Sequence, residues 1–140
     1  MITLFDFFMG RDVAFRNLLT PELRANAAKT VRAAQDLLVL AKGAGQVLHP
    51  NKDFGMVRSG WRPPAINAAT TNASPTSHHM KCLAIDLEDN GHALAKWCQA
   101  NADTVLKDLG LYLEHPDFTP TWCHVQLVPP RSGNRIFRPR

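Results

Sequence analysis

The chain has 140 residues, of which 45% are hydrophobic and 20% are charged, so it can bury a core of its own without disulfides. The net charge of +4 favours anionic partners without naming one. Three cysteines without paired spacing exclude a disulfide framework. We therefore predict one globular domain over residues 1–140, made in a reducing cytoplasm.

No segment of the chain is apolar for long enough to span a bilayer. The longest apolar run is Leu37–Ala41. The first ten residues lack a positively charged start and carry Asp6 inside an apolar stretch, which argues against a signal peptide. We expect no membrane insertion.

The first half of the chain predicts one long helix. Residues 1–19 indicate an irregular or short helical lead-in. Thr20 as N-cap and Pro21 as the first helical residue then begin a helix with an apolar face, which Gly43 and Gly45 end.

The middle of the chain predicts two strands separated by a loop. A short strand is expected over 56–61, and the following Arg-Pro-Pro breaks regular structure. The Asn-, Thr-, Ser- and Pro-containing stretch 65–77 predicts a long surface loop, and loops of this length tend to be functional. In a strand over 83–87, Asp86 would point away from the core.

The second half predicts a helix over 90–109 and strands over 111–114 and 122–128. In the last strand His124 and Gln126 share one face. Helices with clustered short strands and no βαβ alternation predict an α+β fold, with a small antiparallel sheet flanked by helices.

The C-terminal tail is basic. Its composition is typical of a solvated end, and weak attraction to a polyanion is the alternative. No aromatic residues alternate with the arginines as a stacking platform for single strands requires, so nucleic-acid binding is not expected. The arginines concerned are Arg131, Arg135, Arg138 and Arg140.

Two histidines and an aspartate lie where they could converge on one metal ion. Asp86 follows His79 by seven residues, and His124 would come from a second strand. Catalytic zinc sites commonly take three such ligands and leave a fourth position for water. The same set also suits manganese, cobalt or iron.

Three segments share the order and spacing of a known family. SHHMKCLAID at 77–86 is similar to an S-x-H-x-x-G-x-A-x-D signature. VRSGWRPPAIN at 57–67 resembles the SG(Y/W)R-P-x-x-N segment that precedes it, and WCHV at 122–125 resembles a C-terminal W-x-H strand. Over roughly residues 20–130 the chain thus resembles the zinc D-Ala-D-Ala carboxypeptidases and Hedgehog-like metallopeptidases.

The resemblance implies roles for matching positions. Arg62 would hold the substrate carbonyl or carboxylate and stabilise the oxyanion, which suits a planar, permanently charged guanidinium. Ser77 and Trp122 would contact substrate or shape its binding site. One zinc ion would be held by His79, Asp86 and His124.

The general base is less well defined by the resemblance. Some relatives carry an acid three residues before the last histidine, but here Thr121 occupies that position and cannot act as a base. Glu114 is the first candidate, since its strand could lie beside 122–128. His115 is the second, although it would point to the opposite face.

Two further features leave alternatives open. Cys82 replaces the usual glycine of the signature, and it is either a fourth, site-closing metal ligand or a small buried apolar residue. His78 could compete as a ligand, but the motif spacing favours His79.

The resemblance implies a monomeric zinc metallopeptidase that hydrolyses peptidoglycan stem peptides or cross-links, as an endopeptidase or a D,D-carboxypeptidase. Small relatives are common among bacteriophage lysins. Such a protein would be made in the host cytoplasm without a signal peptide and act on the wall after release or within a virion. The alternative is a non-catalytic, metal-binding structural or wall-binding virion protein of the same fold, which Thr121 and Cys82 favour.

Overall fold

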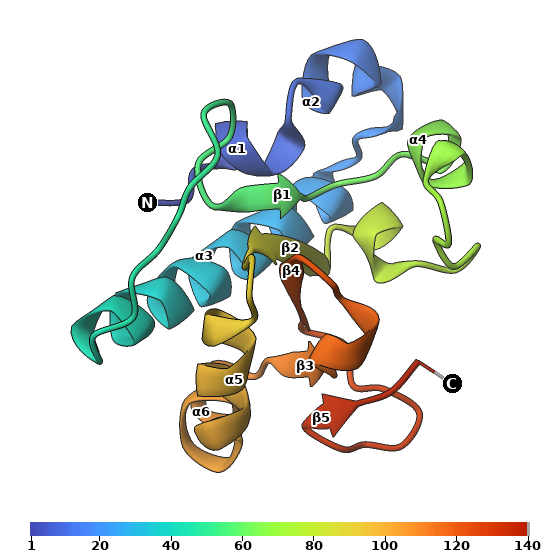
Figure 1. Cartoon of the computed structure of the whole chain (residues 1–140). Helices are drawn as coiled ribbons and strands as arrows, with labels where there is room; N and C mark the ends of the chain where they lie inside the picture. Colours follow the sequence, from blue (N-terminus) through green and yellow to red (C-terminus); the bar gives the residue numbers. More distant parts are fainter. Residues whose placement is uncertain (140) are drawn as a thin grey trace.

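The computed structural model describes residues 1–139, which fold around a five-stranded sheet of order β1-β2-β4-β3-β5 (Figure 1). The neighbours from β1 to β3 are antiparallel, whereas β5 is parallel to β3. The α+β prediction is confirmed, but the sheet is mixed rather than antiparallel, because the chain reverses after β4 and passes to the free edge of β3. The strands are β1 Val57–Ser59, β2 Ala84–Glu88, β3 Tyr112–Glu114, β4 Trp122–Gln126 and β5 Ile136–Phe137.

Helices cover one face and the ends of this sheet (Figure 1). Within residues 1–139, no helix combines the length and apolarity needed to cross a membrane. The α-helices are α1 Leu4–Phe8, α2 Arg11–Ala14, α3 Pro21–Gly43, α4 Pro64–Ala69, α5 Ala93–Ala100 and α6 Lys107–Leu109. Single turns are the 3-10 segments η1 Arg16–Leu18, η2 His78–Lys81 and η4 Pro116–Phe118, and the π-turn η3 Ala102–Leu106.

The long helix α3 begins as its sequence predicts, since the Thr20 hydroxyl accepts the Leu23 N–H at 3.2 Å. The predicted helix over 90–109 is instead interrupted at Asn101, where the backbone leaves helical geometry. The Asn101 side chain donates to the Trp97 carbonyl at 2.8 Å, and such local bonds compete with the helical ladder.

The predicted loop over 65–77 was wrong in its first part, which is the helix α4. Pro64 occupies the first turn of this helix, where its missing N–H costs nothing, so the Pro-Pro pair begins a helix. The rest of the segment is irregular but anchored, because the buried Asn67 side chain donates to the Ser74 carbonyl at 2.8 Å.

The basic tail is only in part a solvated end. Ile136 and Phe137 form β5, which places Phe137 in a buried position at the edge of β3. Arg135 donates to the Leu111 carbonyl at 3.0 Å, and Arg138 pairs with Asp117 at 3.2 Å. Arg140 lies outside the described residues.

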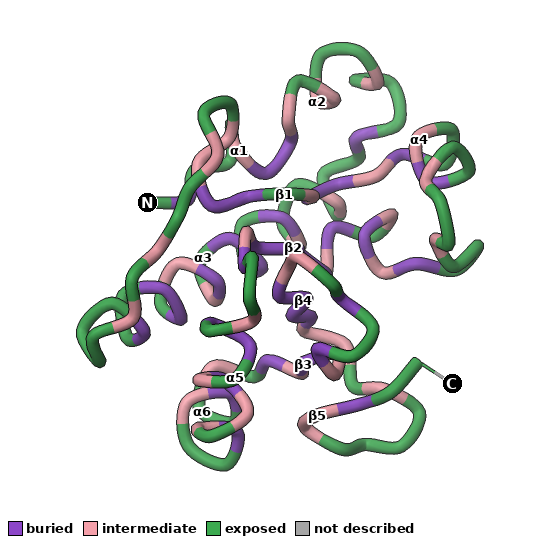
Figure 2. The backbone as a smooth tube through the Cα atoms, in the orientation of Figure 1, coloured by how far each residue is buried: buried purple, intermediate pink, exposed green. Residues whose placement is uncertain are grey.

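Most residues of the central strands β2 and β4 are buried, as the burial colouring shows (Figure 2). Helix α3 packs against β2, and α5 packs against β3 and β4. Because side chains alternate along a strand, the opposite face is left to Asp86, His124 and their neighbours. On the helix-covered face, the buried apolar side chains of β2, β3 and β4 are Ile85, Leu87, Leu113, Cys123 and Val125.

Cys82 adopts a left-handed backbone (φ 58°, ψ 27°), and its side chain is fully buried. Only glycine adopts this geometry freely, and other residues incur a cost of roughly 1–2 kcal/mol. We expect Cys82→Ala to lose buried contacts and about 1 kcal/mol of stability. Cys82→Gly should be at least as stable as Cys82→Ala, because strain relief offsets its smaller side chain.

Urea unfolding of the wild type and the two Cys82 variants measures this difference. Glycine normally costs about 0.5–1 kcal/mol relative to alanine. If Cys82→Gly is less stable than Cys82→Ala by this amount, the left-handed backbone at position 82 is not strained.

Candidate metal centre

The candidate site lies in one row across three neighbouring strands. Asp86 in β2 pairs directly with His124 in β4. On the other side of β4, Tyr112 pairs with Gln126 and Leu113 with Val125. Continuing that antiparallel register by one residue brings Glu114 opposite His124. The sheet therefore presents Asp86, His124 and Glu114 side by side on the face that α3 and α5 leave free.

His79 reaches this row from the short turn η2, which precedes β2. Ser77 begins the turn, and its hydroxyl accepts the His79 N–H at 3.2 Å. The His79 ring is buried, with 1% of the residue exposed, and its Nδ1 lies 2.8 Å from the Gly60 carbonyl oxygen. Since a carbonyl only accepts, Nδ1 carries the proton and Nε2 keeps a free lone pair.

His124 is oriented by Gln126, two residues further along the same face of β4. The Gln126 amide nitrogen donates to the Val128 carbonyl at 2.8 Å, so its oxygen faces Nε2 of His124, also at 2.8 Å. Nε2 therefore carries a proton, and Nδ1 of His124 is the atom left to bind a metal ion. This Nδ1 lies 2.8 Å from Asp86 Oδ1.

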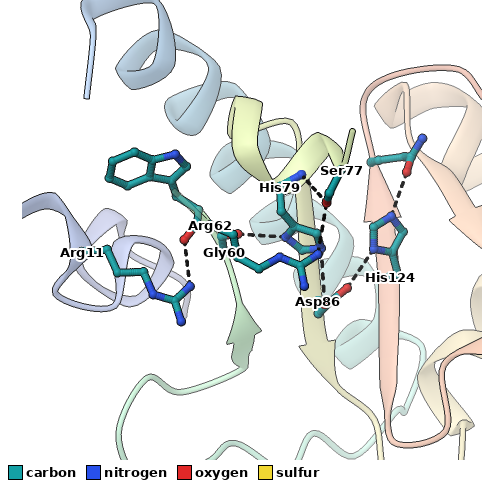
Figure 3. Close-up of polar contacts among 9 residues, drawn as sticks. Arg11, Gly60, Arg62, Ser77, His79, Asp86 and His124 are labelled. Atoms are coloured by element: carbon teal, nitrogen blue, oxygen red, sulfur yellow. Dashed lines mark hydrogen bonds and ion pairs between the residues drawn. The ribbon is translucent and has the colours of Figure 1, made fainter. Parts of the chain in front are cut away.

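The three side chains fit a divalent cation. One ligand atom from each of His79, Asp86 and His124 can be chosen so that all lie within 4.8 Å of one another. Nε2 of His79 is buried, makes no hydrogen bond to any residue within 1–139, and faces Asp86 Oδ2 at 3.3 Å (Figure 3). A lone pair facing a carboxylate oxygen is stable only with a cation or proton between them. Two imidazoles and one carboxylate form a typical three-ligand zinc set.

The charges of the site favour a bound cation. Burial alone would raise the pKa of Asp86, but the two neighbouring histidines hold it well below its ordinary range. Burial lowers the pKa of His79 despite the attraction of Asp86. Asp86 is therefore ionised and His79 neutral at neutral pH, as metal ligation requires.

Arg62 and Ser77 lie beside the triad (Figure 3). Nη2 of Arg62 donates to the Ser77 hydroxyl at 3.1 Å, while its buried Nε has no hydrogen-bond partner in the described part of the chain. Burial lowers the pKa of Arg62, against the effect of the nearby carboxylates Asp86 and Glu114. The guanidinium thus has donor capacity to spare next to the metal ligands.

Glu114 is half-buried, and burial raises the pKa of its carboxyl group. His115 is engaged elsewhere, because its Nδ1 accepts the Asp117 N–H at 3.1 Å and caps η4. Trp122 begins β4 on the same face as His124, and the Arg58 guanidinium lies 5.1 Å from its ring centroid.

Cys82 and His78 are not among the three residues that come together. Cys82 packs in the hydrophobic core, and burial raises the pKa of its thiol to about 12. A protonated thiol is a poor metal ligand. The structure therefore favours Cys82 as a small buried apolar residue over Cys82 as a fourth metal ligand.

Sequence reasoning missed the two groups that orient the histidines, the Gly60 carbonyl and the Gln126 amide. Gln126 had a visible signal, since it shares a strand face with His124. The Gly60 carbonyl had none, because a backbone contact between residues 60 and 79 depends on the tertiary fold.

Metal affinity should depend on pH through His124. Burial alone would lower the pKa of His124, but the hydrogen bond to Asp86 raises it above the ordinary value. Protons therefore compete with a metal ion from a higher pH than for a free imidazole. We expect the apparent zinc Kd to increase about tenfold per pH unit below that pKa, measured by competition with a chromophoric chelator. An affinity that stays constant down to mildly acidic pH would exclude His124 as a ligand.

Comparison with known families matches the chain to the Peptidase M15 family over residues 17–125. Comparison with the curated proteins and with the solved structures finds no match. The matched region covers well over half of the chain and contains all three candidate ligands. The chain therefore belongs to the peptidase M15 family, whose members are zinc-dependent peptidases.

Proposed function

We propose that this protein is a zinc-dependent peptidase that hydrolyses peptide bonds in peptidoglycan stem peptides or cross-links. The observation that carries the proposal is the buried triad of His79, Asp86 and His124 with Glu114 and Arg62 beside it. A triad alone could be structural. Hydrolysis also needs a general base and a hydrogen-bond donor for the oxyanion, and the Glu114 carboxyl group and the unused donors of the Arg62 guanidinium beside the triad meet these needs.

Each neighbouring group has a distinct task in the proposed reaction. His79, Asp86 and His124 would hold the zinc ion, which would supply a Lewis acid for activating water and polarising the scissile carbonyl. Glu114 takes the proton of the attacking water and returns it to the leaving amine. Arg62 donates hydrogen bonds to the oxygen on which negative charge develops. Ser77 holds the Arg62 side chain in place.

Two features support peptidoglycan as the substrate. The sequence segments at 57–67, 77–86 and 122–125 resemble enzymes that act on D-Ala-containing wall peptides. The net charge of +4 suits an anionic wall. We further propose a lysin of bacteriophage type that reaches the wall after release from the cell or as part of a virion, and cuts as an endopeptidase or a D,D-carboxypeptidase.

Digestion of isolated peptidoglycan tests this function. We expect the purified protein to release new muropeptides that mass spectrometry identifies, and a zinc chelator to abolish them. The masses of the products also identify which peptide bond is hydrolysed. If zinc-loaded protein releases nothing from walls of several chemotypes, the enzyme proposal is wrong and the non-catalytic virion protein takes its place.

A further inference from the structure

The N-terminal segment, residues 1–16, lies outside the region that matches the family. It nevertheless contacts residues 60–62, which hold the candidate ligand His79. We propose that this segment, through Arg11, is a positioning element for the ligand His79 and for Arg62. The inference rests on the proposed metal centre. It assigns a role to a part of the chain that the family match leaves without one.

The first contact joins α1 to the segment 60–62. The Phe7 carbonyl accepts the Trp61 N–H at 3.2 Å. Gly60 permits this approach, because a Cβ added there would lie 2.0 Å from the Phe7 carbonyl oxygen. Any other residue at position 60 would push α1 and the 60–62 segment apart.

The second contact comes from α2. Nη1 of Arg11 donates to the Trp61 carbonyl at 2.9 Å (Figure 3). Together with the Phe7 contact, this engages both backbone polar groups of Trp61 with the N-terminal segment. The Trp61 ring, in a residue only 1% exposed, packs edge-on against Phe8 with centroids 6.2 Å apart.

The opposite side of the 60–62 segment holds the metal ligand. The Gly60 carbonyl accepts from Nδ1 of His79 at 2.8 Å, and the Arg62 N–H donates to the His79 carbonyl at 3.1 Å. Residues 60–62 therefore lie between the N-terminal segment and η2. A displacement of Trp61 would move the carbonyl that orients the His79 ring and the backbone from which Arg62 extends.

Arg11 has no other assigned task. Among the described residues, no carboxylate lies within ion-pair distance of its guanidinium. Partial burial of the Arg11 guanidinium costs desolvation free energy. The hydrogen bond to the Trp61 carbonyl is the contact that offsets this cost.

Metal binding by an Arg11 variant tests the inference. Arg11→Met keeps most of the aliphatic stem and removes the donor. Loss of a direct hydrogen-bond partner of a ligand typically weakens metal binding about 10- to 100-fold. Because Arg11 acts on His79 only through residues 60–62, we expect the lower end of this range, about tenfold. Zinc affinity of the metal-free protein is measured by chelator competition, and the cobalt-loaded protein should show a changed visible spectrum because the His79 ligand is reoriented.

Arg16→Met is the matched control, since Arg16 is an exposed arginine of the same segment. It should bind zinc and give the cobalt spectrum as the wild type does. Arg11→Gln, whose shorter side chain cannot reach the Trp61 carbonyl, provides the same test should Arg11→Met fail to fold. Circular dichroism establishes folding for each variant.

The results distinguish failure of the positioning role of Arg11 from failure of the metal centre itself. If the wild type binds zinc and a folded Arg11 variant binds it equally well with an unchanged cobalt spectrum, the positioning role is wrong and the metal centre stands. If the wild type binds no metal, the metal centre fails and the inference fails with it.

Discussion

Replacing Asp86 by asparagine should abolish tight zinc binding while leaving the fold intact. Asp86 lies between the two histidines and is the only one of the three candidate ligands that carries a negative charge. Asparagine keeps the shape but loses that charge. We expect affinity to fall by more than the roughly 10- to 100-fold typical of an outer-shell change.

Thermal unfolding with and without zinc measures this effect. At a zinc concentration a hundred times Kd, binding stabilises the wild type by about 2.7 kcal/mol. For a domain of this size the Tm should rise on the order of 10 °C. The Asp86→Asn variant should show no such rise.

Asp117→Asn is the control for this experiment, because Asp117 is an exposed carboxylate that pairs with Arg138 and is not one of the three candidate ligands. It should keep the full zinc-dependent rise in Tm. An equal rise in the Asp86→Asn variant would mean that zinc binds elsewhere on the protein.

Replacing Glu114 by glutamine should remove hydrolysis and leave zinc binding unchanged. The strand register brings Glu114 opposite His124, but it is not one of the three residues that form the metal group. Loss of a general base costs about 10²- to 10⁴-fold in rate. The rate of muropeptide release and the zinc Kd, measured on the same preparation, separate the two functions.

The pH dependence of this reaction gives a second readout for Glu114. A base must be ionised, and burial raises the pKa of Glu114 above that of a free glutamate. Activity should therefore fall with decreasing pH from a higher point than an exposed glutamate would give. His115→Gln is the matched control and should retain activity, since its ring caps η4. Full activity of the Glu114→Gln variant would mean that another group is the base.

The convergence of His79, Asp86 and His124 could be predicted from sequence because their spacing reflects local structure. His79 and Asp86 belong to a turn and the strand that follows it, so seven residues bring them to one point. His124 needed only a neighbouring strand with the correct face, which the alternation of 122–126 supplied. The long helix was predictable for a similar reason, because Thr20, Pro21 and Gly43 mark its ends locally.

What could not be predicted depends on contacts between distant segments. The short strand β5 has only two residues, and its pairing with β3 decides its structure. The bond from the Gly60 carbonyl to His79 and that from Arg11 to Trp61 involve backbone atoms, which leave no pattern in the side chains.

Cys82 combines a feature that the sequence shows with one that only the fold shows. Its departure from the glycine of the signature that residues 77–86 resemble was visible in the sequence and raised the alternative of a fourth ligand. Only the fold shows that Cys82 lies in the core with a left-handed backbone, where glycine would be the natural choice. The departure therefore concerns backbone strain rather than metal chemistry.

A crystal structure of the zinc-loaded protein, with anomalous data collected at the zinc edge, tests the central claim most directly. The account predicts one zinc ion bound by Nε2 of His79, a carboxylate oxygen of Asp86 and Nδ1 of His124, with Glu114 and Arg62 at its open side. An anomalous peak elsewhere on the protein, or ligation through His78 or Cys82, would contradict it.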